Sequence, residues 1–135
     1  MSTSEERKVM DASVDMIIPK ACNGNKDAEE YLHDIAWANR RMDDIYDKDV
    51  DVPKSEIEHL FMILVVKLLA NPFFIKNFQA LYTQHVVIFN AWIEANKLEQ
   101  SPDKAKQLQA FSLKEQVREL TPLVAFLTGG IGLMR

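Results

Sequence analysis

Residues 43–47 read DDIYD, with carboxylates at Asp43, Asp44 and Asp47, and five aspartates lie between residues 40 and 53. On a helix, Asp43 and Asp47 are one turn apart, so both side chains can reach one cation. Without a cation their charges would repel each other. The spacing therefore indicates binding of a hard divalent cation, which prefers oxygen ligands.

A helical hairpin would have to position these aspartates. Apolar periodicity predicts one helix that ends near Asp47 and another that begins at Pro53. If the two helices pack antiparallel about a turn near Asp51, residues equally far from the turn lie at the same height. The aspartates are then level with two residues of the second helix. The predicted ligands of Mg²⁺ or Mn²⁺ are Asp43, Asp44, Asp47, Glu56 and His59.

A helical wheel supports a different interpretation of the same aspartates. At 100° per residue, the apolar stripe of the first helix centres on Ile35, Met42 and Ile45. Asp43 and Asp47 then lie roughly 110° to 150° away from that stripe. Acidic residues opposite an apolar stripe are typical of a solvated helix face. A metal site and a solvated face are both open hypotheses.

The motif resembles two enzyme families. Residues 43–47 are similar to the aspartate-rich motif of terpene and prenyl synthases, whose aspartates bind Mg²⁺ that grips a diphosphate. Together with Glu56-x-x-His59, they also resemble the metal site of the all-α nucleotide pyrophosphatases, which carry [DE][DE]xx[DE] on one helix and ExxD on the next. His59 stands where that second family has an acid. The resemblance implies Mg²⁺-dependent hydrolysis of a phosphoanhydride, in which the metal activates water.

Two longer segments, residues 21–49 and 123–135, are similar to small helical proteins of tailed phages and prophages. This resemblance implies a bacterial or viral cytoplasmic setting and names no activity.

The chain as a whole predicts an all-α fold, because its long apolar patterns recur at three and four residues. We expect a single helical domain over residues 1–135, a bundle of five to six helices with a central hydrophobic helix at 53–70. The other expected helices begin at Ser4, Asp27, Asn71 and Ser101, with expected breaks at Pro19, Thr121-Pro122 and Gly129-Gly130.

Composition excludes several classes of function. The 135 residues are 47% apolar and 27% charged, which is typical of a globular protein, and the net charge of −4 makes nucleic acid an unsuitable partner. The most apolar run, 60–70, is too short to span a membrane, so we expect no membrane insertion. With Cys22 as the single cysteine and no secretory pattern at the N-terminus, the sequence indicates a cytoplasmic protein.

The C-terminal segment is unusually apolar for a chain end, with PLVAFL at 122–127 followed by Ile131, Leu133 and Met134. It is predicted either to close the bundle or to join the chain to a protein partner or to further copies. Three functions follow. The first is a small, phage-related binding or accessory protein whose acidic hairpin tip can take a divalent cation. The alternatives are a Mg²⁺-dependent nucleotide hydrolase and a structural subunit of a larger particle.

Overall fold

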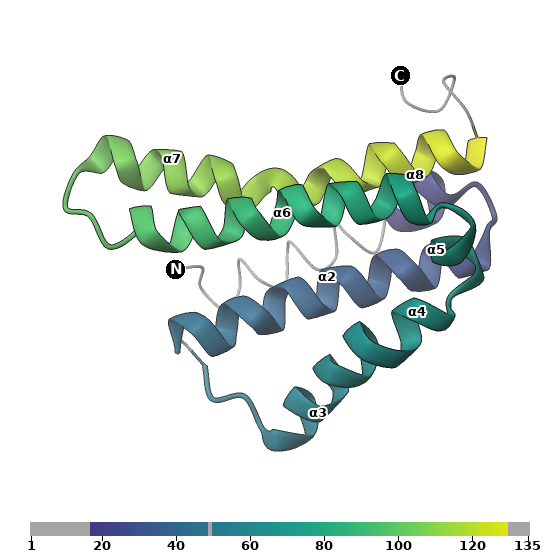
Figure 1. Ribbon diagram of the computed structural model, residues 1–135, viewed down its shortest axis with the longest axis horizontal. Coiled ribbons are helices and arrows are strands. Elements are labelled where there is room, and N and C mark those ends of the chain that lie inside the picture. Colours follow the sequence, from purple (N-terminus) through teal and green to yellow (C-terminus); the bar gives the residue numbers. More distant parts are fainter. Residues whose placement is uncertain (1–16, 49, 130–135) are drawn as a thin grey trace.

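The computed structural model describes residues 17–48 and 50–129, and these confirm an all-α fold (Figure 1). Within them no residue lies in a strand. Residues 17–22 are helical and precede the first labelled element. The helices are α2 (Lys26–Asp47), α3 (Lys54–Met62), η1 (Ile63–Lys67), α4 (Leu68–Ala70), α5 (Pro72–Lys76), α6 (Phe78–Leu98), α7 (Lys104–Lys114), η2 (Glu115–Glu119) and α8 (Leu120–Gly129).

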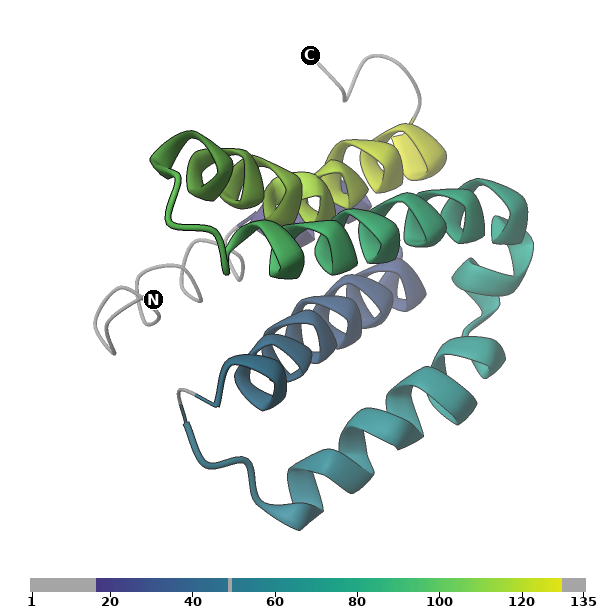
Figure 2. The ribbon, with the colours of Figure 1, turned by 60° about the vertical axis from the view of Figure 1, so that its left-hand side comes forward.

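Helix α2 is the central element of this arrangement. It contacts α5 and α8 near its start and α3 and η1 along its length. One face is covered by α6 and by the rod that α7, η2 and α8 form together (Figures 1 and 2). On another side lies the continuous helix α3–η1–α4, residues 54–70, which we call the arm (Figure 2).

Two clusters of buried side chains hold these layers together. The main core joins α2 to α5, α6 and α8, and its fully buried members include Tyr31, Leu81, Leu120 and Val124. A smaller cluster joins the arm to α2 through Ala38, Leu60 and Ile63. Leu68, near the end of the arm, belongs to the main core, so the arm is anchored in both clusters.

Local capping explains where several helices begin. The side chain of Asn25 accepts the amide N–H of Ala28 at 3.0 Å, so α2 is capped by Asn25 and not by Asp27 as the sequence suggested. Asn71 caps α5 by accepting the N–H of Phe74 at 3.1 Å, with Pro72 at the first helical position, as predicted.

Two predicted breaks and one predicted helix start differ from the structure. The helix before α2 continues through Pro19 to Cys22, and Asn23 and Gly24, both with positive φ, make the turn that follows. The last rod is irregular at η2, a 3₁₀ stretch, and α8 passes through Pro122. The predicted start at Ser101 falls at Asp103, whose side chain accepts the N–H of Ala105. The predicted cap at Ser4 lies outside the described residues.

The central position predicted for residues 53–70 is wrong. The arm lies at the edge of the protein, and its exposed side chains include Phe61, Val65 and Leu69. Only the opposite face, with Leu60, Ile63 and Leu68, is buried. A helix that is apolar on all sides was expected to be enclosed, whereas α2, with a polar face, occupies the centre.

The middle of the arm, η1, is a π-helical turn. The N–H of Leu68 bonds to the carbonyl of Ile63, five residues back, instead of the usual four. Both residues are buried against the rest of the chain. The wider turn thus brings two apolar side chains that are five positions apart onto one face.

Candidate functional site

The carboxylates of the DDIYD motif surround a lysine from a distant part of the chain. The ammonium of Lys114 on α7 lies 3.2 Å from Oδ1 of Asp43, 4.0 Å from Oδ2 of Asp47 and 2.6 Å from Oε1 of Glu99. The indole N–H of Trp92 donates to the same oxygen of Asp43 at 2.9 Å. Asp43 and Asp47 therefore neutralise a cation that the protein itself supplies.

A second cation, Arg41, takes two more of the predicted ligands. Its guanidinium lies 3.2 Å from Oδ2 of the buried Asp44 and 3.3 Å from Oε2 of Glu56, and it covers the ring of Trp37 at 5.0 Å. His59 packs edge-on against Trp37, with 4.7 Å between the ring centroids. The hairpin does bring Glu56 and His59 close to α2, as predicted.

The four predicted carboxylate ligands thus pair with two different cations: Asp43 and Asp47 with Lys114, and Asp44 and Glu56 with Arg41. Within residues 17–48 and 50–129, no three His, Cys, Asp or Glu side chains are grouped so that they could hold a metal ion. Metal binding by these five residues stays a prediction. A divalent cation would have to displace the ammonium of Lys114 to reach Asp43 and Asp47.

Lys114 is strongly held in its charged form. Burial alone would favour the neutral amine, but the hydrogen bond to Glu99 and the attraction of Asp43 outweigh burial and raise the pKa of Lys114. The ammonium also reduces the mutual repulsion of the three carboxylates around it.

Replacing Lys114 with glutamine should make the aspartates available to a divalent cation. We expect Mg²⁺ or Mn²⁺ to raise the melting temperature of Lys114→Gln more than that of the wild type, since the cation replaces the lost ammonium. A cation at 100 times its Kd adds about 2.7 kcal/mol. Melting curves with EDTA or with each metal measure this, and Asp43→Asn/Asp47→Asn in the same background is the control. Equal melting temperatures with EDTA and metal would refute the metal hypothesis.

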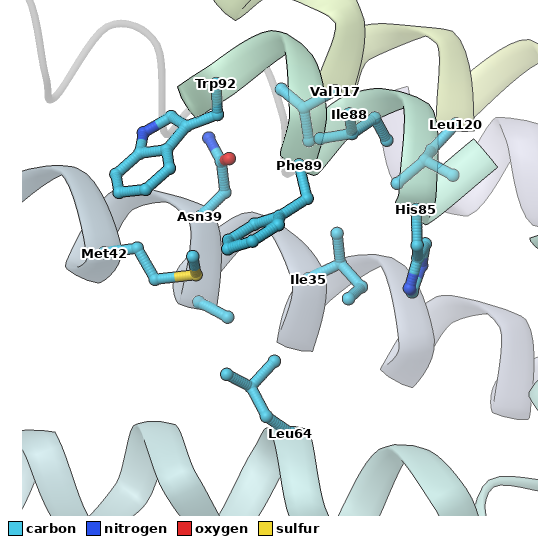
Figure 3. A pocket seen from close by; sticks show the side chains of 11 residues that line it. Ile35, Asn39, Met42, Leu64, His85, Ile88, Phe89, Trp92, Val117 and Leu120 are labelled. Atoms are coloured by element: carbon cyan, nitrogen blue, oxygen red, sulfur yellow. The ribbon is translucent and has the colours of Figure 1, made fainter. Parts of the chain in front are cut away.

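An apolar cleft lies between α2, the arm and α6, and the sequence did not predict it (Figure 3). Its volume is about 240 Å³. Leu64 of the arm forms one wall and Phe89 of α6 faces it, with Ile35 and Met42 of α2 between them (Figure 3). The lining is completed by Ala38, Asn39, His85, Ile88, Trp92, Val117 and Leu120.

His85 lies at one end of the cleft and points toward α2 (Figure 3). Its Nε2 lies 2.6 Å from the hydroxyl oxygen of Tyr31, and the two rings are nearly parallel. Burial lowers the pKa of His85 and raises that of Tyr31. The imidazole is therefore neutral, and its Nε2 shares a hydrogen bond with the tyrosine hydroxyl whose direction follows from the tautomer.

The lowered pKa of His85 predicts a loss of stability in mild acid. The usual pKa of 6.5 holds for the unfolded chain, and the folded value lies below it. As the pH falls below 6.5, the unfolded state binds a proton first, so the free energy of unfolding decreases by up to about 1.4 kcal/mol per pH unit until the folded pKa is reached. In His85→Gln this slope should be smaller. Urea unfolding between pH 7.5 and about pH 5 measures it, and equal slopes would contradict the assignment.

Two rows of exposed apolar side chains flank the cleft. The first, which we call the arm stripe, points away from α2 and consists of Phe61, Met62, Val65, Val66 and Leu69. The second, which we call the α6 stripe, begins on α5 and consists of Ile75, Phe78, Tyr82, Val86, Phe89 and Ile93. Phe89 belongs both to the α6 stripe and to the wall of the cleft.

The described part of the C-terminal apolar segment packs mainly into the chain's own core. Val124 and Ala125 of α8 are buried, and Leu123 and Leu127 pack against the same cluster. Phe126 is exposed. Ile131, Leu133 and Met134 lie outside the described residues. An interface through this segment stays a prediction, while larger exposed apolar surfaces lie on the arm and on α6.

Comparison of the chain with protein-family models, with curated proteins and with solved structures finds no match. The resemblances to phage proteins, to terpene synthases and to nucleotide pyrophosphatases are therefore untested. No helix among residues 17–48 and 50–129 has the length and apolar character needed to cross a membrane.

Proposed function

We propose that this chain is a non-enzymatic helical binding protein that works by docking a protein partner on the arm stripe, the α6 stripe and the cleft between them. The observation that carries the proposal is the exposure of eleven large apolar side chains, each between 37% and 63%, in these two stripes. A phage-related accessory role, as the sequence resemblance implies, is compatible with this activity.

The extent of the two stripes supports a docking role. A whole residue of this size has an area of about 200 Å², so eleven residues exposed by about half present roughly 1,100 Å² of apolar surface. The largest apolar patch on a typical monomer covers about 300–600 Å². Each stripe alone reaches the upper part of that range, and the chain carries two of them.

The stripes also lie on segments that are almost free of charge. Residues 77–93 contain no Asp, Glu, Lys or Arg, and residues 60–75 contain only Lys67. Lys67 turns toward α2, where its ammonium lies 3.2 Å from Asp34 and 3.6 Å from Glu30. A partner can therefore cover both stripes without removing an ionic group from water, which would be costly.

Two groups that could act as nucleophile or base, Cys22 and His85, are instead built into the core. Cys22 is buried, and burial raises the pKa of its thiol to about 11, which removes the reactive thiolate at neutral pH. The Nε2 atom of His85 is occupied by Tyr31. Both features favour binding over nucleophilic catalysis.

A structural subunit of a larger particle is the second candidate. The arm stripe faces away from α2, while the α6 stripe borders the cleft, so the two can contact different neighbours. The hydrolase hypothesis has no such support, and the cation experiment with Lys114→Gln tests it.

Site-specific photocrosslinking in cells tests the proposal. We expect p-benzoylphenylalanine at Phe61 to give a discrete adduct with a polypeptide, either another protein or this chain. Phe111 on α7 is the matched control, because it is exposed by 67% against 60% for Phe61 and lies outside both stripes. A discrete polypeptide adduct from position 61 alone supports the proposal. No adduct at position 61, or the same products from both positions, would overturn it.

A further inference from the structure

We infer that the docking partner is a second copy of this chain, in a two-fold dimer where the arm stripe of each copy packs on the α6 stripe of the other. This inference rests on the proposed function and identifies the partner. It follows from the areas of the stripes, from their chemistry and from the way in which the arm is attached.

The two stripes match in area. The five residues of the arm stripe are exposed by 49–63% and the six of the α6 stripe by 37–58%. With about 200 Å² per residue, each stripe presents roughly 560 Å². Two surfaces that cover each other must be similar in area, and at about 200 Å² per residue these two are.

Two-fold symmetry makes use of both stripes at once. In an isologous dimer, a contact from the arm of one copy to α6 of the other is repeated in the opposite sense. Each copy then buries roughly 1,100 Å², and the pair roughly 2,200 Å². A stable interface of standard size needs about 800 Å² per partner, and permanent homodimers bury about 2,000 Å² or more in total. The apolar area is sufficient for a stable dimer.

The chemistry of the stripes also suits a second copy. Each chain carries a net charge of −4, so two copies repel each other wherever acidic surfaces meet. Neither stripe contains an ionisable group other than the hydroxyl of Tyr82. The contact therefore joins like-charged molecules through uncharged faces and leaves their acidic groups in water.

The attachment of the arm leaves its stripe accessible to a neighbour. The arm is held by its inner face, through the cluster of Ala38, Leu60 and Ile63, through Leu68 in the main core and through the ion pairs of Lys67 with α2. The arm stripe is exposed and lies outside these contacts. On α6, Phe78 stacks on Tyr82 at 5.3 Å between ring centroids, which makes this part of the α6 stripe an aromatic surface. The same chain thus carries two exposed apolar surfaces, the arm stripe and the α6 stripe, that can pack on each other in a dimer.

Molar mass in solution is the first measurement. By light scattering after gel filtration, the wild type should have twice the chain mass of 15.5 kDa. Phe61→Glu/Val65→Glu should have the mass of one chain, because dimerisation would bury four unpaired carboxylates and weaken by at least about 100-fold. Leu108→Glu/Phe111→Glu on α7, with comparable exposure and the same added charge, should stay dimeric. Circular dichroism of each variant checks that the helices remain.

Disulfide trapping then tests which stripes meet. Because Cys22 is buried, a cysteine introduced at Val65 or at Val86 is the only exposed thiol among the described residues of its chain. Mixing Val65→Cys chains with tagged Val86→Cys chains should give a disulfide-linked pair containing one of each, and Leu108→Cys mixed with Val86→Cys should not.

The possible results separate this inference from the proposed function. A monomeric wild type, together with a crosslink from position 61 to a different protein, would overturn the dimer and leave the docking role intact. A dimer that Phe61→Glu/Val65→Glu does not dissociate, or that is trapped only as Val65–Val65 pairs of cysteine variants, would also overturn the arm-to-α6 contact. A monomer without any adduct at position 61 would overturn both.

Discussion

Replacing Tyr31 with alanine is expected to lower the free energy of unfolding by about 3–5 kcal/mol, the usual cost of removing a large aromatic ring from a core. The ring is fully buried on α2 and packs against Phe73 and Phe74 of α5, with centroid distances of 5.8 and 5.9 Å, and against His85 of α6 at 5.8 Å. One side chain therefore connects three helices, and its loss leaves a cavity that none of them can fill alone.

Tyr31→Phe is the matched control, because it keeps the ring and removes only the hydroxyl that is hydrogen-bonded to His85. It should cost about 1–2 kcal/mol, since the buried Nε2 of His85 loses its hydrogen bond. Urea unfolding followed by circular dichroism measures both changes. A cost for alanine that is no larger than the cost for phenylalanine would show that the ring does not connect the helices as described.

Replacing Asn71 with alanine is expected to cost about 2–3 kcal/mol, because one side chain makes two buried connections. Its oxygen accepts the N–H of Phe74 and starts α5, while its amide donates to the carbonyl of Asp27 at 3.0 Å, which ties this corner to the first turn of α2. Asn71 is one of the few polar residues in the core. Its loss leaves the N–H of Phe74 and the carbonyl of Asp27 without these partners.

Two further variants separate the contributions of Asn71. Asn71→Asp keeps the acceptor for Phe74 and loses the donor to Asp27, so it should lose less stability than alanine. Asn77→Ala removes an amide at the other end of α5, which donates to the carbonyl of Phe73 and makes no capping hydrogen bond to the first turn of α6. Thermal melts should rank the losses as Asn71→Ala largest and Asn77→Ala smallest. If Asn77→Ala were equally costly, the cap at Asn71 would have no special role.

Features set by neighbouring residues were predictable from the sequence. The cap at Asn71 with Pro72 behind it, and the end of α2 at Asp47, depend on contacts within one helical turn. The partners of the acidic motif depend on contacts far apart in the chain. Lys114 is 71 positions away from Asp43, and no spacing in residues 40–59 indicates that a lysine from α7 will lie among those carboxylates.

The location of the arm shows a second feature that the sequence pattern does not predict. Apolar residues on all sides of a helix indicate that the helix will be covered, but the pattern is the same whether the cover comes from the chain itself or from another molecule. A second pattern in the sequence indicates that the chain has more apolar surface than it can cover. Residues 77–93, a stretch as long as the arm, contain no Asp, Glu, Lys or Arg. Two helical segments, 60–75 and 77–93, in which Lys67 is the one charged residue offer more apolar surface than α2 can cover.

The π-helical turn of the arm has a consequence for the tolerance of the chain to insertions and deletions. Ile63 and Leu68 face the same side only because η1 contains one residue more than an α-helix needs. Deleting the exposed Val66 would place Ile63 and the present Leu68 four positions apart. On a regular α-helix this spacing separates them by about 40°, so both side chains would still face inward. Inserting a residue would place them about 240° apart and turn Leu68 outward. Related chains that differ in length are therefore expected to lose a residue in this turn and not to gain one.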